Sequence, residues 1–221
     1  MLEVVKSTLL IISALLPIVN PLSSTPIFLL LTREYDSSTR IKLAWKIAFN
    51  SFFLLIVSLL VGTHILSFFD ISLPVVQVGG GLVVISTGWM MLNRPDGERE
   101  RGSSHHAVDR TDILSNAFYP LTLPLTVGPG SISVAITLGA NAPHAHGFDL
   151  LSLIASLAGS IIVSVAVFLC YGSAERIARL VGPTGMSVIL RLSSFLLVCI
   201  GVQILWNGAS VLLASVPIHA H

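Results

Sequence analysis

The chain has 221 residues, of which 53% are hydrophobic and only 10% are charged. With a mean hydropathy of +0.88, this balance excludes an ordinary soluble domain and indicates a protein of the lipid bilayer. The net charge of +1 and the lack of a tract rich in Lys and Arg give no support for a nucleic-acid partner.

Six apolar stretches predict an all-α, polytopic membrane protein. A hydrocarbon core about 30 Å thick needs roughly 20 apolar residues per helix. Six stretches meet this length: 8–32, 43–69, 72–93, 113–139, 149–172 and 187–214. The sequence therefore predicts one three-helix unit at residues 1–93, a polar cytoplasmic linker at 94–112 and a second three-helix unit at 113–221.

The positive charges lie almost entirely on one side of such a chain. With six spans, the loops after the first, third and fifth segments share one side, and 11 of the 12 Lys and Arg residues fall in or beside them. Only Lys6 belongs to the opposite side. Because short cytoplasmic loops are enriched in Lys and Arg, the pattern predicts that these loops are cytoplasmic and that both termini are periplasmic.

The first segment is interrupted by the sequence LLPIVNPLSSTP, residues 15–26. Proline has no amide hydrogen and clashes with the carbonyl four residues earlier, so each of its three prolines deprives one carbonyl of a helical partner. Unsatisfied carbonyls are costly in hydrocarbon. We therefore expect them to face protein, water or a ligand in a cavity at mid-depth, with the helix beginning again near residues 25–28.

The fourth segment carries a second copy of this interruption. PLTLPLTVGP (120–129) and PIVNPLSSTP (17–26) have prolines at the same spacing, and a hydroxyl residue, Thr126 or Ser23, at the same place. Ordinary proline kinks are one explanation, but interrupted segments at matching positions of two halves are typical of a transporter's binding site. Since each half spans the membrane three times, the sequence predicts two inverted repeats with discontinuous first and fourth helices.

The interruptions offer groups that could bind both ends of a zwitterion. Freed carbonyls and the Asn20 amide oxygen are acceptors suited to an ammonium group or a sodium ion, whereas the first amides of a restarting helix favour an anion. Gly128 and Gly130 leave the backbone open to a ligand, with the second restart expected near residues 130–132. The predicted substrate site comprises Pro17, Asn20, Pro21, Ser23, Thr25, Pro120, Pro124, Thr126, Gly128, Gly130 and Ser131.

The charges available in the predicted segments narrow the ligand class. No Asp or Glu lies deep in any segment, so a small zwitterionic solute without net charge is expected. The same lack favours coupling to sodium, or to a proton carried by the substrate, over a proton relay in the protein. Asn20 and the carbonyls of Pro17 and Pro120 are assigned to the ammonium group. The carboxylate is assigned to Ser23, Thr25, Thr126 and the backbone of residues 128–131.

These motifs resemble those of the MarC family of bacterial inner-membrane proteins. The resemblance covers the whole chain and is carried by LLPIVNPL and YPLTLPLTVGPGSI in the interrupted segments, GGGLVVISTGWMML in the third and RLSSFLLVCIGVQILWNG in the sixth. The family is classed with six-helix neutral amino acid transporters, so the resemblance implies a multi-pass inner-membrane protein that moves glycine- or alanine-like solutes.

The sequence shows no motif for catalysis, nucleotide binding or metal binding. The motifs G-x-S-x-G and H-E-x-x-H and the P-loop are absent, so neither an enzyme nor a cofactor is expected. The pairs His105/His106, His144/His146 and His219/His221 lack the convergent third ligand that a zinc site needs, so no metal site is assigned.

The primary expectation is a secondary transporter of small neutral amino acids that works by alternating access around a fixed midplane site. A passive channel or export valve gated by the proline motifs is one alternative. A membrane protein that scaffolds partners without transport is another, and the sequence leaves the oligomeric state open.

Overall fold

The computed structural model describes residues 2–32, 35–93, 117–141 and 150–215. Within these ranges all regular structure is helical, which confirms the predicted all-α class. The predicted linker at 94–112 and the three histidine pairs lie outside the described residues.

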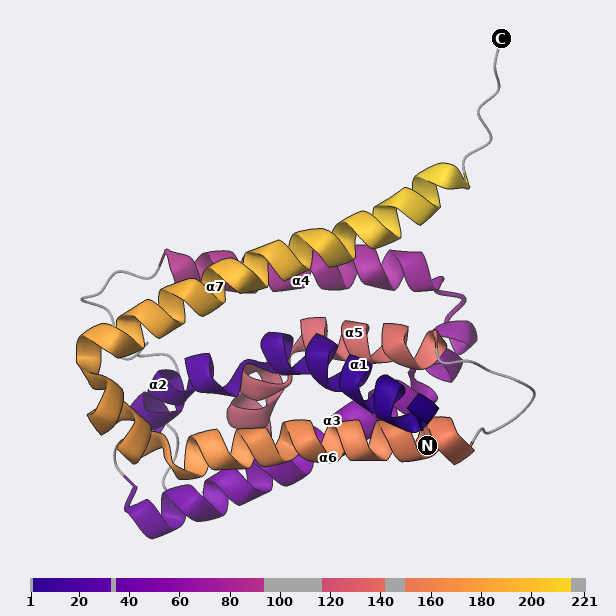
Figure 1. Cartoon of the computed structure of the whole chain (residues 1–221). Helices are drawn as coiled ribbons and strands as arrows, with labels where there is room; N and C mark the ends of the chain where they lie inside the picture. The colour runs from indigo at the N-terminus through magenta and orange to yellow at the C-terminus, as the bar shows by residue number, and fades with distance from the viewer. Residues whose placement is uncertain (1, 33–34, 94–116, 142–149, 216–221) are drawn as a thin grey trace.

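The described chain forms eight helical elements (Figure 1). The first half contributes α1 (Leu2–Val19), α2 (Pro21–Leu31), α3 (Ser37–Phe68) and α4 (Leu73–Leu92). The second half contributes η2 (Ala117–Thr126), α5 (Pro129–Ala140), α6 (Leu150–Gly172) and α7 (Ala174–Ala214).

Five stretches of the described chain are long and apolar enough to cross a membrane. These are Glu3–Leu31, Ser37–Phe68, Leu73–Leu92, Leu150–Gly172 and Thr184–Ala214. The predicted fourth segment differs, because it consists of the 10-residue η2 and the 12-residue α5, and each is shorter than the roughly 20 residues that a span needs. A multi-pass membrane protein is thus confirmed, whereas the six-span inverted repeat stays a prediction.

The last helix begins earlier than the predicted segment at residue 187. α7 starts at Ala174 and changes direction at Gly182, where φ is 70° and ψ is 170°. Glycine adopts this positive φ at little steric cost. The apolar stretch Thr184–Ala214 follows the change of direction.

Small residues bring α4 and α7 together along their length, and in Figure 1 this pair lies beside the remaining helices. An added Cβ at Gly81 would lie 2.6 Å from the Leu205 nitrogen, and one at Gly88 would lie 2.9 Å from the Ser194 oxygen. As the residue number rises along α4, the number of the α7 residue in contact with it falls, so the two helices are antiparallel. Close backbone approach through small residues is the usual way that membrane helices pack.

The other helices pack around the interrupted segments. α1 and α2 contact α6, while η2 and α5 contact α3. In turn, α2 contacts α7 and α5 contacts α4. The buried apolar side chains of α1, α2, α3, η2, α5 and α6 form one continuous core, with members including Leu15, Phe28, Ile47, Val127 and Tyr171.

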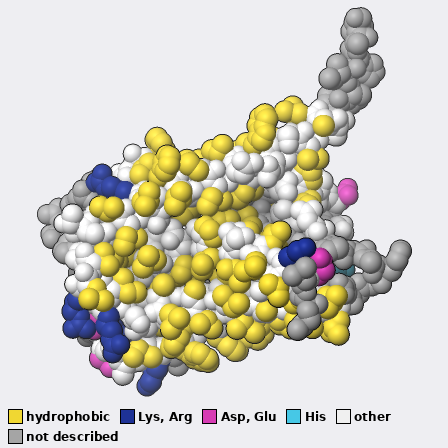
Figure 2. All heavy atoms as spheres, viewed as in Figure 1, with side chains coloured by type: hydrophobic (Ala, Val, Ile, Leu, Met, Phe, Trp, Pro, Cys, Tyr) yellow, Lys and Arg dark blue, Asp and Glu magenta, His cyan; other side chains and the backbone are white. Residues whose placement is uncertain are grey.

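Large apolar side chains cover much of the outer surface, as expected for helices that face lipid (Figure 2). The basic side chains gather at one end, which we call the basic end: the end at which α2 and α6 finish and α3 and α7 begin. Its described basic residues include Arg40, Lys42, Lys46, Arg176 and Arg179. Lys6 lies in α1, which begins at the opposite end.

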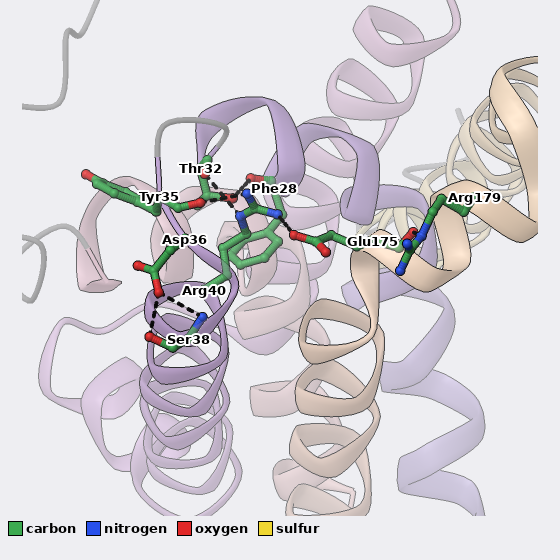
Figure 3. A network of polar contacts seen from close by, with 8 residues as sticks. All are labelled: Phe28, Thr32, Tyr35, Asp36, Ser38, Arg40, Glu175 and Arg179. Carbon is green, nitrogen blue, oxygen red and sulfur yellow. Dashed lines mark hydrogen bonds and ion pairs between the residues drawn. The ribbon is translucent and has the colours of Figure 1, made fainter.

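Asp36 caps the start of α3 and should make stability depend on pH (Figure 3). Hydrogen bonds donated by the side chains of Ser38 and Thr39 lower the pKa of Asp36 from 3.8 to about 2. A lowered folded-state pKa means that the carboxylate stabilises the protein fully above about pH 4 and loses this contribution as the pH falls towards 2. Asp36→Asn should therefore lower Tm at pH 6 and differ less from wild type at pH 2.5. Melting curves of both proteins in detergent test this, and a Tm difference that does not change with pH would contradict it.

Candidate functional site

The first interruption is built around Asn20, between α1 and α2. Asn20 has a left-handed backbone conformation, with φ 43° and ψ 58°, which Asn adopts more readily than most residues other than glycine. Its side-chain oxygen accepts a hydrogen bond from the Ser23 amide at 3.4 Å. Pro21 occupies the first turn of α2, where no amide hydrogen is needed. The Asn-Pro pair thus ends one helix and starts the next.

The structure corrects the position at which this helix begins again. The sequence predicted a restart near residues 25–28, but α2 begins at Pro21. The reason is the Asn20 cap, which supplies an acceptor one turn before the expected restart. Pro26 lies inside α2 without ending it, so Ser23 and Thr25 belong to the first two turns of the helix.

The hydroxyl groups that follow Asn20 differ in their hydrogen bonding. Ser23, Ser24 and Thr25 are all buried. The Thr25 hydroxyl donates to the Pro21 carbonyl at 2.8 Å, whereas the Ser23 hydroxyl is fully buried and has no hydrogen-bond partner. An unpaired buried hydroxyl costs about 1–3 kcal/mol, so Ser23 is the residue here that is best placed to gain a ligand.

The second interruption has a different backbone. Tyr119 (φ −124°, ψ 128°) and Leu123 (φ −106°, ψ 126°) are extended within η2, because a residue before proline is disfavoured in the helical region. The Val127 amide donates to the Thr122 carbonyl at 2.9 Å, five residues back. Gly128 then caps α5. The predicted restart near residues 130–132 is therefore close to the observed start of α5 at Pro129.

The polar side chains of the second interruption are already paired. The Thr126 hydroxyl donates to the Leu121 carbonyl at 2.7 Å and lies 3.0 Å from the Tyr171 hydroxyl. The Ser131 hydroxyl donates to the Gly128 carbonyl at 2.8 Å. To bind a carboxylate as the sequence predicted, either hydroxyl would have to give up a backbone partner.

Gly130 has a packing role, whereas its predicted ligand contact stays a prediction. It is buried, and an added Cβ would collide with the Val84 side chain of α4. Its lack of a side chain therefore brings α5 close to α4. The neighbouring Ser133 hydroxyl joins the same two helices by donating to the Val76 carbonyl at 2.9 Å.

The two interruptions lie side by side near the middle of the molecule (Figure 1). α1 packs against α5 and α2 packs against η2, so the elements on either side of one interruption contact those of the other. Pro120 and Pro124 belong to η2, and Pro21 is buried at the start of α2. Pro17, by contrast, is an exposed residue within α1, which weakens its assignment to the site.

Several polar groups of the surrounding helices lie outside the predicted substrate site. Asn50 of α3 donates to the Thr122 hydroxyl at 3.3 Å, which ties η2 to α3. The buried hydroxyls of Ser51, Ser160 and Ser164 have no hydrogen-bond partner. Most other buried hydroxyls of the described helices donate to a carbonyl of their own helix, so sequence alone gives no signal that separates these three from the rest.

Tyr171 was also missed, although it contacts both interrupted segments. Its ring stacks on Phe28 of α2, with centroids 4.5 Å apart and an interplanar angle of 4°. Its hydroxyl lies 3.0 Å from the Thr126 hydroxyl of η2. Both aromatic side chains are almost fully buried. A single tyrosine at the end of an apolar segment was the only sequence signal.

Comparison with known proteins finds relatives in one family of membrane proteins. Residues 5–213 match the model of the MarC family of integral membrane proteins. The chain is 33% identical over 215 residues to the inner membrane protein MarC of Salmonella typhimurium, covering 94% of this chain and 96% of that protein. It is 32% identical to the proteins of the same name from Citrobacter koseri and Escherichia coli O139:H28, with the same coverage. No solved structure matches.

These matches extend over nearly the whole chain and include both interrupted segments. Together with the apolar helices, they identify a multi-pass protein of the inner membrane. The chain belongs to the MarC family of integral membrane proteins.

Proposed function

We propose that this protein is a secondary transporter of small neutral amino acids, such as glycine and alanine, that works by alternating access. The observation that carries the proposal is the Ser23 hydroxyl, fully buried without a hydrogen-bond partner at the capped start of α2. This helix start lies beside a second interrupted segment, the arrangement in which transporters bind substrates.

The packing of the helices supports an inverted repeat, on which many alternating-access transporters are built. α1 and α2 pack on α6, as η2 and α5 pack on α3. Likewise α2 packs on α7, as α5 packs on α4, while α3 pairs with α6 and α4 with α7. Each of these contacts made by one half of the chain thus has a counterpart made by the other half. This is the pattern expected of two related three-helix units of opposite orientation. The positive-inside rule makes the basic end cytoplasmic and places both termini in the periplasm.

The proposed site assigns some of the predicted residues a different role from the one that the sequence suggested. The Ser23 hydroxyl would bind the substrate carboxylate near the start of α2, since a helix start favours an anion. The Asn20 side-chain oxygen and the carbonyls of Pro17 and Pro120, which lose a helical donor at Pro21 and Pro124, would face the ammonium group. Thr25, Thr126 and Ser131 would shape the site, because their hydroxyls already donate to backbone carbonyls.

No carboxylate lines this site among the described residues. The described Asp and Glu residues all lie at helix ends: Glu3, Asp36, Asp70 and Glu175. A solute without net charge needs no countercharge, and a buried carboxylate for a proton relay is not present in the described helices. We therefore propose coupling to sodium or to a proton that travels with the substrate.

Counterflow in proteoliposomes tests the transporter directly. Vesicles preloaded with unlabelled glycine should accumulate labelled glycine faster than empty vesicles, because a carrier exchanges bound solute whereas a channel does not. Imposed sodium and proton gradients, applied separately, identify the coupling ion. If glycine and alanine enter equally fast with and without preloading, the protein is a channel; if neither moves, the transporter proposal is wrong.

Replacing Ser23 should weaken substrate binding without lowering the stability of the protein. Ser23→Ala removes an unpaired buried hydroxyl, so Tm should be unchanged or slightly higher. A hydrogen bond to a charged group contributes about 1.5–3 kcal/mol, so the apparent affinity for glycine in counterflow should fall about tenfold or more. The matched control is Ser58→Ala, whose buried hydroxyl donates to the Leu54 carbonyl at 2.6 Å within α3. Unchanged affinity in Ser23→Ala would remove Ser23 from the site.

A further inference from the structure

Two layers of contacts lie between the first interruption and the basic end. α2 runs from Asn20 towards that end, and its buried side presents Thr25, Phe28 and Thr32 on successive turns. Phe28 and Thr32 each belong to a layer that joins the first half of the chain to the second. Both layers contact α2 or its C-terminal cap, between the interruption and the basic end.

The inner layer is the stack of Phe28 on Tyr171. The rings are parallel to within 4°, with centroids 4.5 Å apart, and the Tyr171 hydroxyl is 3.0 Å from the Thr126 hydroxyl. This layer therefore joins α2, α6 and η2, and connects directly to the second interruption. Because both rings are fully buried, they exclude water from this level.

The outer layer is centred on Arg40 (Figure 3). The guanidinium donates to the Thr32 carbonyl at 3.2 Å and to the Tyr35 carbonyl at 2.6 Å, and it forms an ion pair with Glu175. The Arg40 side chain is 16% exposed and that of Glu175 is 43% exposed. The layer joins the end of α2 and the start of α3 to the start of α7, so α2 cannot move away from α6 and α7 without breaking it.

The opposite end of the molecule is held in another way. An added Cβ at Gly139 of α5 would collide with the Leu59 carbonyl of α3, and one at Gly62 would collide with Ile136. The Gly139 contact is with backbone, which has no side chain to rotate aside, whereas the Gly62 contact is with the Ile136 side chain. Rotation of two rings and separation of a partly exposed ion pair are smaller changes than separation of the α3 and α5 backbones, so along α2 the basic end is the easier end to open.

We propose that the Phe28–Tyr171–Thr126 stack and the Arg40–Glu175 pair form a two-layer gate that closes the substrate site towards the cytoplasm. The proposal rests on the transport function above and specifies how access to the same site is controlled. The structure is the state with this gate closed. Opening requires both that the ion pair separates and that the aromatic rings part.

Cysteine accessibility tests the gate without any transported solute. The reporter is Ser23→Cys in a chain with Cys170→Ala and Cys199→Ala, labelled with a membrane-impermeant methanethiosulfonate applied to either face of oriented vesicles. Labelling from the cytoplasmic face should be slow. Glu175→Gln should speed it about fivefold, because it breaks a partly exposed ion pair and such pairs have about this effect on an equilibrium, and Phe28→Leu should speed it further.

The matched control is Arg179→Gln, since the Arg179 side chain is exposed and donates only within α7, to the Glu175 carbonyl at 3.3 Å among the contacts described. It should leave the labelling rate unchanged. Size-exclusion profiles establish that each variant is folded, and Phe28→Leu keeps an apolar side chain so that the core stays filled. Equal labelling rates in the reporter, Glu175→Gln and Phe28→Leu chains would overturn the gate.

Failure of the gate and failure of the transport proposal give different results. If glycine counterflow is present but labelling does not respond, the gate is wrong and the transporter stands. If labelling responds but glycine does not exchange, the gate controls access for a different solute and the assigned substrate is wrong.

Discussion

Gly81→Ala is expected to lower Tm by several degrees. A Cβ at this position would lie 2.6 Å from the Leu205 nitrogen and 2.8 Å from the Gly201 carbonyl oxygen. Both atoms belong to the backbone of α7, so the two helices would have to separate. Overpacking of this kind costs about 1–3 kcal/mol, which for a chain of this size corresponds to about 2–12 °C in Tm. Thermal unfolding in detergent, followed by tryptophan fluorescence or static light scattering, measures the shift.

Gly79→Ala is the matched control, two residues earlier on the same helix. An added Cβ there meets nothing within 4 Å, and alanine favours a helix over glycine by up to about 1 kcal/mol. Its Tm should be equal to or above that of wild type. Equal Tm values for Gly81→Ala and Gly79→Ala would contradict the close packing of α4 against α7.

The largest effect on transport is expected at Asn20. Two variants distinguish its role in the backbone, as a cap with positive φ, from its role as a ligand of the substrate. Asn20→Ala removes both the cap and a side chain that tolerates positive φ, which together cost about 1–3 kcal/mol of stability. Asn20→Gly accepts the positive φ and costs only about a few tenths of a kcal/mol as a cap. The Gly variant should therefore fold almost as stably as wild type but lack the amide oxygen.

We expect both Asn20 variants to lose most glycine counterflow, with about a tenfold or greater fall in apparent affinity for the stable Gly variant. The measurement is the initial rate of counterflow against glycine concentration, with Tm recorded for each protein. Wild-type affinity in Asn20→Gly would mean that Asn20 only shapes the backbone, and the ammonium contact would then have to come from carbonyl groups alone.

The interruptions themselves follow from local chemistry, so the sequence predicted them. Proline cannot donate a helical hydrogen bond wherever the chain places it, and an apolar stretch of sufficient length forms a helix in lipid. The residue at which the helix begins again after the first interruption was harder to predict. Whether a helix begins at Pro21 or four residues later depends on the left-handed conformation of Asn20, which the rest of the fold must stabilise.

The roles of individual site residues depended on tertiary contacts. Gly130 looked like an opening for a ligand, yet Val84 fills the space beside it. Ser23 and Thr25 looked equivalent, yet one hydroxyl is paired and the other is not. A hydroxyl can turn towards its own helix or away from it at similar energy, so only its neighbours decide which rotamer is populated.

By itself, the sequence determined the membrane class, the helical composition and the positions of the two breaks, because each depends on hydropathy or on proline within a few residues. Only the tertiary structure decided which groups meet. The stack of Phe28 on Tyr171 and the Arg40–Glu175 pair, whose members are 135 residues apart, join segments distant in the chain. Local sequence carries no signal for such contacts, since they are fixed by how the helices pack across the two halves.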